Sequence, residues 1–564
     1  MVDAPSRIVL ALLVAAAAVP DRAAAQTFRV SGSVAAEAAA YGVSGRPARR
    51  PDFVGETVAQ LQLQAGGFQT GVRAVLSTDE SSTRQQVSQL GLNGSWAWGE
   101  AGVGYVPLDW ARFGVSGVSV LGAALTLRPG SFLIGFGGGR IQRAAPGSGF
   151  GDGSQAVPGA LGGPALERWL WAGRLGVGKR DASHFHLTGS YGTDRVGEVA
   201  APGRPKPAQN LSISPGIGVA VRMGEGQLRL RTEGTVSIYT RDTNSASVDI
   251  AEWPLADLFP LRESTAGTGA AAATLGLDWP SWGLQTEYER VQPGFQSMGV
   301  PYTRDDQEIV SVRPRVRIAG RLDLDGGIRL QRNNLGDTRS STQERRQADL
   351  RMRWRPGKAF TLTASTRQME SSSVPTAASP AAPLQRQEHR VMAVQVAPTL
   401  NWRSGGLAHV LVLSTTYQEL TDRSPAVLDG SRPGAASATG AVNTAYTMST
   451  RTGAQVGLRV NTQRTEGDLV EIQTAGGTIS GSLPVPTLRL RLSPGVSLNR
   501  TQLTRAAEQA GGTTENTVLS GSLTAALLID SRNSITLRLR GSRAEGSAIS
   551  FREGEAALRY ERRF

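Results

Sequence analysis

The sequence predicts an all-β protein, a large up-and-down antiparallel transmembrane β-barrel of about 26 strands (about 24–26) without a plug domain. Apolar and polar residues alternate from about Phe28 to the last residue, Phe564, as in strands with two different faces. Tight turns alternate with longer polar connections, which is typical of barrels with short periplasmic turns and long extracellular loops. The chain also ends on an aromatic residue. Because strand alternation starts so early, we expect no room for a plug domain.

The first 25 residues are expected to be a secretory signal peptide. Arg7 precedes an apolar run, Ile8–Val19, that is too short to cross a bilayer as a helix. Small residues at Ala23 and Ala25 complete the cleavage pattern, although a buried N-terminal helix is the alternative. Residues 26–564 would then form a single barrel domain. No later segment has the roughly 18 consecutive apolar residues of a membrane helix, and the absence of cysteine excludes disulfides and thiolate sites.

The strands follow one another as hairpins. Ala59, Leu61 and Leu63 alternate with glutamines and lead into a tight turn at Gly66-Gly67, a common hairpin connection. Further tight turns are predicted at Gly99-Glu100 and at Gly224-Glu225-Gly226. The segment 468–483 is taken as a strand mainly because an up-and-down order requires one there. Long extracellular loops are predicted near residues 144–166, 240–265, 292–306 and 370–385.

The last strand carries a resemblance. In "EGEAALRYERRF" the residues Leu558, Tyr560 and Phe564 share one face, and this resembles the terminal strand of bacterial outer-membrane proteins that the barrel-assembly machinery recognises. Arg562 departs from the pattern, because an apolar residue is commoner there. The resemblance implies an integral outer-membrane location in a Gram-negative cell envelope, with outer-membrane lipid, lipopolysaccharide and the barrel-assembly machinery as partners.

A second resemblance covers a shorter segment. Residues 288–308, "YERVQPGFQSMGVPYTRDDQE", look like part of large, mostly uncharacterised outer-membrane barrels of gliding-type (Bacteroidetes-like) bacteria. This resemblance implies a barrel and no particular activity.

Arginines alternate with apolar residues in several strands, first in "LRLRTEG", residues 228–234. An arginine on the lipid face costs about 2–4 kcal/mol at the midplane, so the apolar residues should face lipid and the arginines the lumen. The lumen-lining candidates are Arg229, Arg231, Arg329, Arg351, Arg353, Arg489, Arg491, Arg538 and Arg540.

These arginines allow three interpretations. Rings of arginine favour anions in channels. Alternatively, the arginines bridge carboxylates across the wall and stiffen it. The third interpretation is compositional, since only Lys179, Lys206 and Lys358 are lysines among 60 basic residues. The net charge of +13 is therefore no argument for nucleic acid, and we find no basic helix for such a partner.

Motifs for catalysis, cofactors or metals are weak. "GRLGVGKR", residues 173–180, lacks the Ser or Thr that follows the lysine of a phosphate loop. His184 and His186 share one face of a strand as metal ligands would, but a solvated pair is the alternative interpretation. The acids Asp305, Asp306 and Glu308 fit no calcium-loop spacing. We therefore predict no cofactor, no metal and no catalytic residue.

The apolar loop around Trp253 and Phe259 could narrow the lumen, offer a partner surface or pack on itself. The first functional hypothesis is a pore or export conduit in the outer membrane that favours anionic solutes or polymers, since barrels of about 16–18 strands already hold an aqueous channel. The second is a structural or assembly component of a surface or secretion machine, with its lumen filled by a periplasmic or surface partner. A barrel-embedded hydrolase ranks third.

Overall fold

A computed structural model describes most of the chain. The described residues are 28–79, 89–144, 165–179, 182–195, 205–248, 256–257, 259–301, 304–376, 386–424, 436–468, 470–505, 512–547 and 550–564. The predicted signal peptide, residues 1–25, lies outside them.

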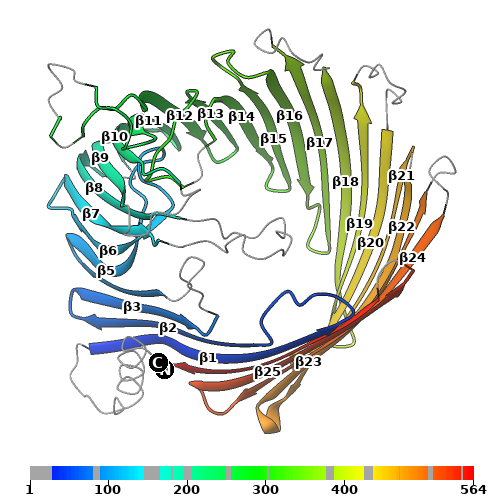
Figure 1. Ribbon diagram of the computed structural model, residues 1–564. Coiled ribbons are helices and arrows are strands. Elements are labelled where there is room, and N and C mark those ends of the chain that lie inside the picture. Colours follow the sequence, from blue (N-terminus) through cyan, green and yellow to red (C-terminus); the bar gives the residue numbers. More distant parts are fainter. Residues whose placement is uncertain are drawn as a thin grey trace.

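The described residues form one antiparallel sheet of 26 strands that closes on itself (Figure 1). The first half of the wall consists of β1 (Phe28–Ser44), β2 (Phe53–Ala65), β3 (Phe68–Ser77), β4 (Gln89–Trp96), β5 (Gly99–Leu108), β6 (Val118–Leu127), β7 (Phe132–Gln142), β8 (Glu167–Gly178), β9 (His184–Arg195), β10 (Gln209–Met223), β11 (Gly226–Thr240), β12 (Thr265–Asp278) and β13 (Trp282–Val291). The second half consists of β14 (Gln307–Ile318), β15 (Leu322–Asn333), β16 (Ser341–Trp354), β17 (Phe360–Pro375), β18 (Gln387–Ser404), β19 (Leu407–Asp422), β20 (Ala436–Ser449), β21 (Gln455–Gly467), β22 (Val470–Val485), β23 (Leu490–Arg505), β24 (Thr513–Leu528), β25 (Asn533–Gly546) and β26 (Phe551–Arg563).

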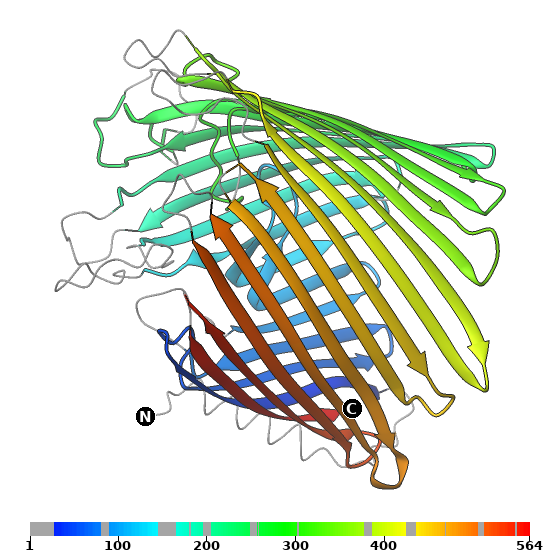
Figure 2. The ribbon, with the colours of Figure 1, turned by 90° about the vertical axis from the view of Figure 1, so that its right-hand side faces the viewer.

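The predicted fold class is therefore confirmed, as is the strand count of 26. The segment taken as a strand only from the up-and-down order is β22. Each strand pairs with its sequence neighbours, and all strands tilt in the same sense (Figure 2), as barrel closure requires. The one helix among the described residues is a single 3-10 turn, η1 (Pro486–Leu488), so none is long and apolar enough to span a membrane.

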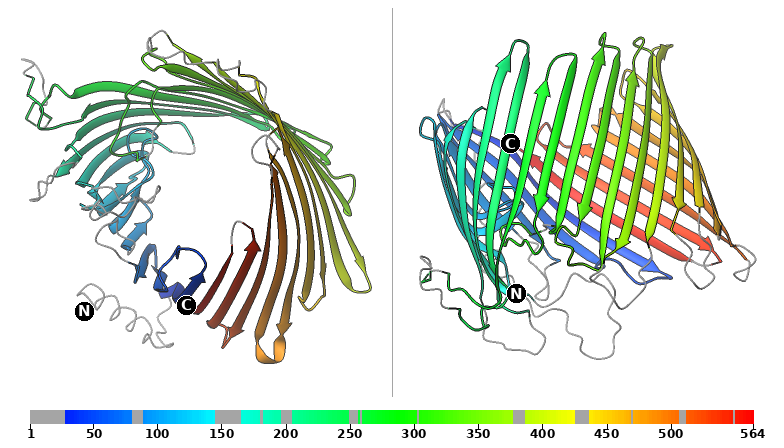
Figure 3. Two further views of the ribbon diagram at one scale, coloured as in Figure 1. Left: turned by 45° about the vertical axis from the view of Figure 1, so that its right-hand side comes forward. Right: turned by 90° about the horizontal axis from the view of Figure 1, so that it is seen from above.

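The barrel closes where β26 pairs with β1, from Ser33 opposite Arg563 to Ser44 opposite Arg552. In the left view of Figure 3 the last strands, in red, lie beside the first, in blue. Ion pairs reinforce this seam. Arg538 of β25 reaches across β26 to Glu37 of β1, and Arg46 pairs with Glu553 and stacks on Phe551, 3.9 Å from its ring centre.

Replacing Glu37 by Gln should weaken this seam. Arg538 would lose its carboxylate in a partly buried position, which we expect to cost about 1 kcal/mol. The measurement is the temperature at which the folded barrel loses its faster mobility on a denaturing gel. Glu100→Gln is the matched control, because the Glu100–Arg128 pair is exposed and far from the seam. Equal melting of the two variants would contradict the assigned role.

The connections differ at the two ends of the barrel. At the end where β1 begins and β26 ends, every connection between strands has two to five residues; we call this the turn side. At the other end, the loop side, most connections are longer. Gly66-Gly67 and Gly224-Glu225 turn as predicted, and β17 continues to Pro375, into the predicted loop 370–385.

One predicted turn was wrong. Gly99 and Glu100 are the first residues of β5, and the turn is Ala97-Trp98. The glycine serves a close approach instead, since a Cβ atom at Gly99 would lie 2.5 Å from the Trp96 ring.

The outward face of the barrel is apolar. Its large side chains are exposed, as they are in barrels that face lipid. Examples are Phe136, Leu175, Val236, Ile328, Ile479 and Leu558. Near the turn side, aromatic rings pair along the wall, with centres 5.4 Å apart for Trp96 and Trp98 and 4.7 Å for Trp279 and Trp282. Trp354 and Trp402 continue this girdle, which marks one boundary of the apolar band.

The last strand joins the same girdle. Tyr560 is exposed among the outward residues and donates to Asn533 Oδ1 at 2.6 Å. The Phe564 amide donates to Gly32 O at 3.0 Å. Arg562, which departs from the terminal pattern, lies over the Phe564 ring at 5.1 Å. Recognition of Tyr560 and Phe564 by the assembly machinery stays a prediction.

Candidate functional site

Residues 109–117, between β5 and β6, fold from the loop side onto the inner wall (Figure 1). Ala111 and Val115 bridge this segment into a small hairpin, with N–O distances of 3.0 and 2.9 Å. The residues at and after the end of this hairpin are apolar where they face the inside of the barrel. Val115 and Val120 pack against Leu170 of β8, and all three are fully buried. This contact explains an inward-facing leucine in a strand that otherwise carries arginine on that face.

Residues 292–301, between β13 and β14, fold inward beside the first segment. The Phe113 and Phe295 rings meet edge to face, with centres 6.2 Å apart, and pack on Ala270 and Ala272 of β12. Ser297 Oγ donates to Gly114 O at 2.9 Å, and the Met298 amide donates to Asn210 Oδ1 at 3.1 Å. The two inward segments, as we call residues 109–117 and 292–301, therefore hold each other against β10–β12.

Arg112 ties the first segment to the wall. Its amide donates to Glu233 Oε1 of β11, and its guanidinium pairs with Glu287, at 2.8 Å, and with Glu289 of β13. Burial opposes the charge, but the hydrogen bond to Glu287 and the negative charges of both glutamates raise the pKa of Arg112 above its ordinary value. The guanidinium therefore stays charged wherever the barrel is folded.

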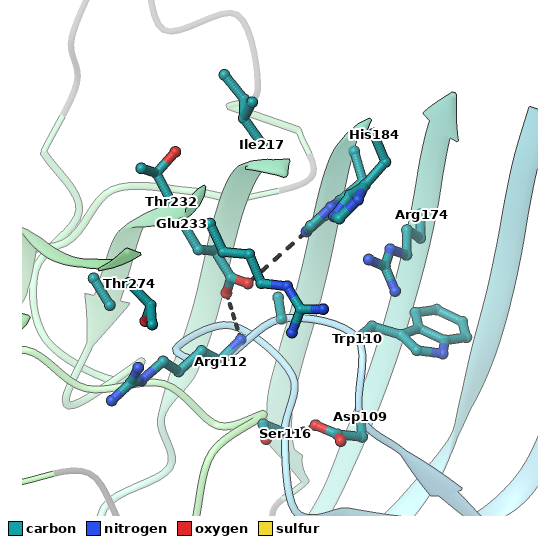
Figure 4. A pocket seen from close by; sticks show the side chains of 14 residues that line it. Asp109, Trp110, Arg112, Ser116, Arg174, His184, Ile217, Thr232, Glu233 and Thr274 are labelled. Atoms are coloured by element: carbon teal, nitrogen blue, oxygen red, sulfur yellow. Dashed lines mark hydrogen bonds and ion pairs between the residues drawn. The ribbon is translucent and has the colours of Figure 1, made fainter. Parts of the chain in front are cut away.

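Under this segment lies a cavity of about 370 Å³ (Figure 4). Its charged and aromatic lining consists of Asp109, Trp110, Arg112, Arg174, His184, His186, Arg231 and Glu233. The two histidine rings stack with centres 5.8 Å apart, and His186 Nε2 lies 3.9 Å from Glu233 Oε2. His186 is buried, so the pair belongs to the inner wall rather than to a solvated rim.

The structure places Arg229 and Arg231 in a second cavity, of about 520 Å³. Arg229 donates to Gln227 Oε1 at 3.0 and 2.5 Å. Arg231 lines both cavities and has no ion-pair partner among the described residues. Four arginines and three aspartates line this second cavity: Arg229, Arg231, Arg313, Arg315, Asp278, Asp325 and Asp349.

The other candidate arginines lie further along the sheet, on β15, β16, β23 and β25 and in the turn after η1. Arg351 and Arg353 of β16 are exposed and stand opposite Asp325 and Asp323, although Asp323 pairs with Arg317 and Arg355 instead, at 2.8 Å each. Within the described part of the chain, five of these candidates, all in strands, carry no ion pair: Arg329, Arg351, Arg353, Arg491 and Arg540.

Two candidates have other surroundings. Arg538 pairs with Glu37 at the seam. Arg489 lies in the turn after η1 rather than in a strand, with φ of 50°, and donates to Ile529 O at 3.2 Å.

The acidic residues considered as calcium ligands interact with other side chains, two of them with an arginine. Asp306 is buried and pairs with Arg339 at 2.5 Å, and Asp305 pairs with the same arginine at 3.1 Å. Glu308 accepts a hydrogen bond from Tyr288 on the outer face. Among the described residues, no group of three acids, histidines or cysteines could hold a metal.

In the predicted apolar loop, Trp253 lies outside the described residues, so its role stays a prediction. Phe259 is fully buried and meets Tyr191 edge to face, with centres 6.5 Å apart. Tyr191 shares its face of β9 with the exposed Phe185 and Leu187. This part of the loop therefore packs toward the outer face.

No family model matches the chain, and no curated protein is similar to it in sequence. Solved structures that resemble it include OccAB2 of Acinetobacter baumannii, with 9% identity, a TM-score of 0.31 and coverage of 64% of this chain and 92% of the other. The outer membrane protein OpdK of Pseudomonas aeruginosa has 12% identity, a TM-score of 0.28 and coverage of 64% and 94%. OpdQ of the same organism has 10% identity, a TM-score of 0.30 and coverage of 70% and 97%. Similarity at this level carries no function to the chain.

Sequence reasoning missed the two inward segments and Arg112. The segment "DWARFGVSG", residues 109–117, has no period that distinguishes it from an exposed loop. A usable signal was present in the strands, since Val120, Leu170 and Ala172 are apolar residues on faces that should be polar in a water-filled barrel.

Proposed function

We propose that this protein is an outer-membrane pore that the two inward segments narrow and that favours anionic solutes. The observation that carries the proposal is the exposure of both faces of the wall. On β16, Leu350 is exposed on the outward face and Arg351 on the inward face. In a closed barrel a solvated inner face means a water-filled lumen, as 26 strands also lead one to expect.

The inner charges support the anion preference. Eight of the nine candidate arginines form no ion pair with any described residue, the exception being Arg538, so pairing between charges of the wall accounts for few of them. Arginine-lined pores select anions, and charge in a narrow low-dielectric passage acts over longer distances than in free solution. Larger anionic polymers would also fit this chemistry where the inward segments leave room.

The alternative of a barrel filled by a partner predicts a different behaviour. Such a barrel would be electrically silent and would co-purify with a periplasmic or surface protein. None of the contacts described above favours that alternative.

Reversal-potential measurements in a planar bilayer with a KCl gradient test the proposal. We expect anion selectivity, and we expect Arg229→Gln with Arg231→Gln to lower the anion-to-cation permeability ratio about two-fold or more. Arg332→Gln, on the outward face of β15, is the matched control and should leave the ratio unchanged. A cation-selective pore, or equal ratios in both variants, would refute the anion preference. A silent barrel would refute the pore.

A further inference from the structure

A row of opposite charges crosses the outward face of six neighbouring strands near the loop side. Arg290, Glu308, Arg332 and Glu344 stand directly opposite one another on β13, β14, β15 and β16. The row continues on β16–β18, where Glu370 stands opposite both Arg346 and Arg390. We call these seven residues the rim ladder. Opposite charges on facing positions stabilise neighbouring strands, so the alternation of sign keeps the arginines from repelling one another.

The rim ladder lies at the loop-side boundary of the apolar band. On β16, Glu344 and Arg346 share a face with the exposed Leu350 and with Trp354 of the turn-side girdle. Ten positions separate Glu344 from Trp354, close to the roughly 9–11 residues with which a tilted strand crosses the hydrocarbon. An arginine there costs about 0–1 kcal/mol, against about 2–4 at the midplane. The ladder therefore lies level with lipid headgroups.

The guanidinium groups of the ladder are only loosely held. The nearest N–O distances are 3.4 Å from Arg346 to Glu344, 3.7 Å from Arg290 to Glu308, 3.6 Å from Arg332 to Glu308 and 3.9 Å from Arg390 to Glu370. These exceed the roughly 3.2 Å limit of a good N–H···O hydrogen bond. By contrast, the lumenal Arg355–Asp323 pair measures 2.8 Å. The side chains of Arg290, Arg332 and Arg346 are 50%, 52% and 68% exposed, so they are accessible from the surroundings of the barrel.

We propose that the rim ladder binds the phosphate groups of lipopolysaccharide in the outer leaflet. Arginine donates two parallel N–H groups to a phosphate, and such charge-assisted pairs are the stronger ones. Neighbouring strands are about 4.8 Å apart. Arg290 and Arg332 are two strands apart, so their guanidinium groups can bind phosphates at two nearby positions. Leu330 and Leu350 below them meet the acyl chains. The inference depends on the outer-membrane location in the proposed function, but not on conduction.

Native mass spectrometry of the delipidated full barrel in detergent, titrated with bisphosphorylated lipid A, tests the proposal. The variant Arg290→Gln/Arg332→Gln/Arg346→Gln should bind about ten-fold more weakly. The control carries the same changes at three arginines on the inward faces of β14, β16 and β17, namely Arg317, Arg345 and Arg367, and should bind as the unmodified barrel does. Inorganic phosphate is added as a competitor and should not displace lipid A, because the acyl chains add to the headgroup contacts.

A second variant separates lost binding from lost folding. Glu308→Gln removes the carboxylate that competes for Arg290 and Arg332, so lipid A should bind about two- to three-fold more tightly. A misfolded barrel could not produce this gain. Binding of dephosphorylated lipid A as tight as that of the bisphosphorylated form, or equal loss in the ladder and control variants, would overturn the proposal. Displacement by inorganic phosphate alone would assign the ladder to a free anion instead. Because binding is measured without current, the result is independent of whether the barrel conducts.

Discussion

Replacing residues 110–116 by a two-residue glycine–serine turn is expected to raise the single-channel conductance about two-fold or more, since pore conductance follows the open cross-section of the barrel. The barrel should tolerate the change. Leu108 and Val118 stand opposite each other at the ends of β5 and β6, and a tight turn joins strands in this arrangement. Planar-bilayer recordings of the refolded barrel measure the effect.

The control is the same replacement at residues 451–453, an exposed turn-side connection between β20 and β21. We expect its conductance to equal that of the unmodified barrel. If the excised barrel folds, by gel mobility, and its conductance does not rise, the first inward segment does not limit the current and the constriction must be assigned elsewhere.

Phe295→Ala is expected to release both inward segments from the wall. Phe295 is buried at the centre of the cluster that joins Phe113 to Ala270 and Ala272. Removing a buried phenylalanine ring costs about 3–5 kcal/mol, which is comparable to the whole stability of a short segment held by local contacts. The steady current should become flickering between levels. Trypsin should also cleave after Arg112, whose amide and guanidinium are held by three glutamates in the folded barrel.

Phe136→Ala is the matched control, because Phe136 is 62% exposed on the outward face of β7. The same chemical change should leave the current and the protease pattern unaltered. Quiet recordings and an intact chain in the Phe295 variant would show that the segments are held by the polar contacts of Arg112, Ser297 and Met298 rather than by the aromatic cluster.

The predictions that succeeded depend on local pattern. Alternation at period two identifies a strand without knowledge of its neighbours, so the strand β11 followed from the alternation in residues 228–234 alone. The error at Gly99 arose because a local pattern does not show contacts in space. A glycine was interpreted as a turn residue, whereas its role is to admit the ring of Trp96, which is a contact in space.

Ion pairing could not be predicted in this way. Of the candidate arginines, Arg538 pairs with Glu37, 501 residues away along the chain. Arg353 stands opposite Asp323, but Asp323 pairs with Arg317 and Arg355 instead. The strand register fixes which backbone positions face each other. Which arginine pairs with which carboxylate depends on how far each long side chain reaches and on whether another arginine is closer.

The sequence by itself determined the fold class of this protein and a strand number of about 26, because alternation and turn chemistry act within a few residues. Only the tertiary structure decided that residues 109–117 and 292–301 fold onto the inner wall, and that charges of β13–β18 line up as one rim ladder. The inward segments depend on the contact between Phe113 and Phe295, and the rim ladder depends on the register of strands that each carry one or two of its charges. No local pattern encodes either of them, because each exists only when distant segments meet.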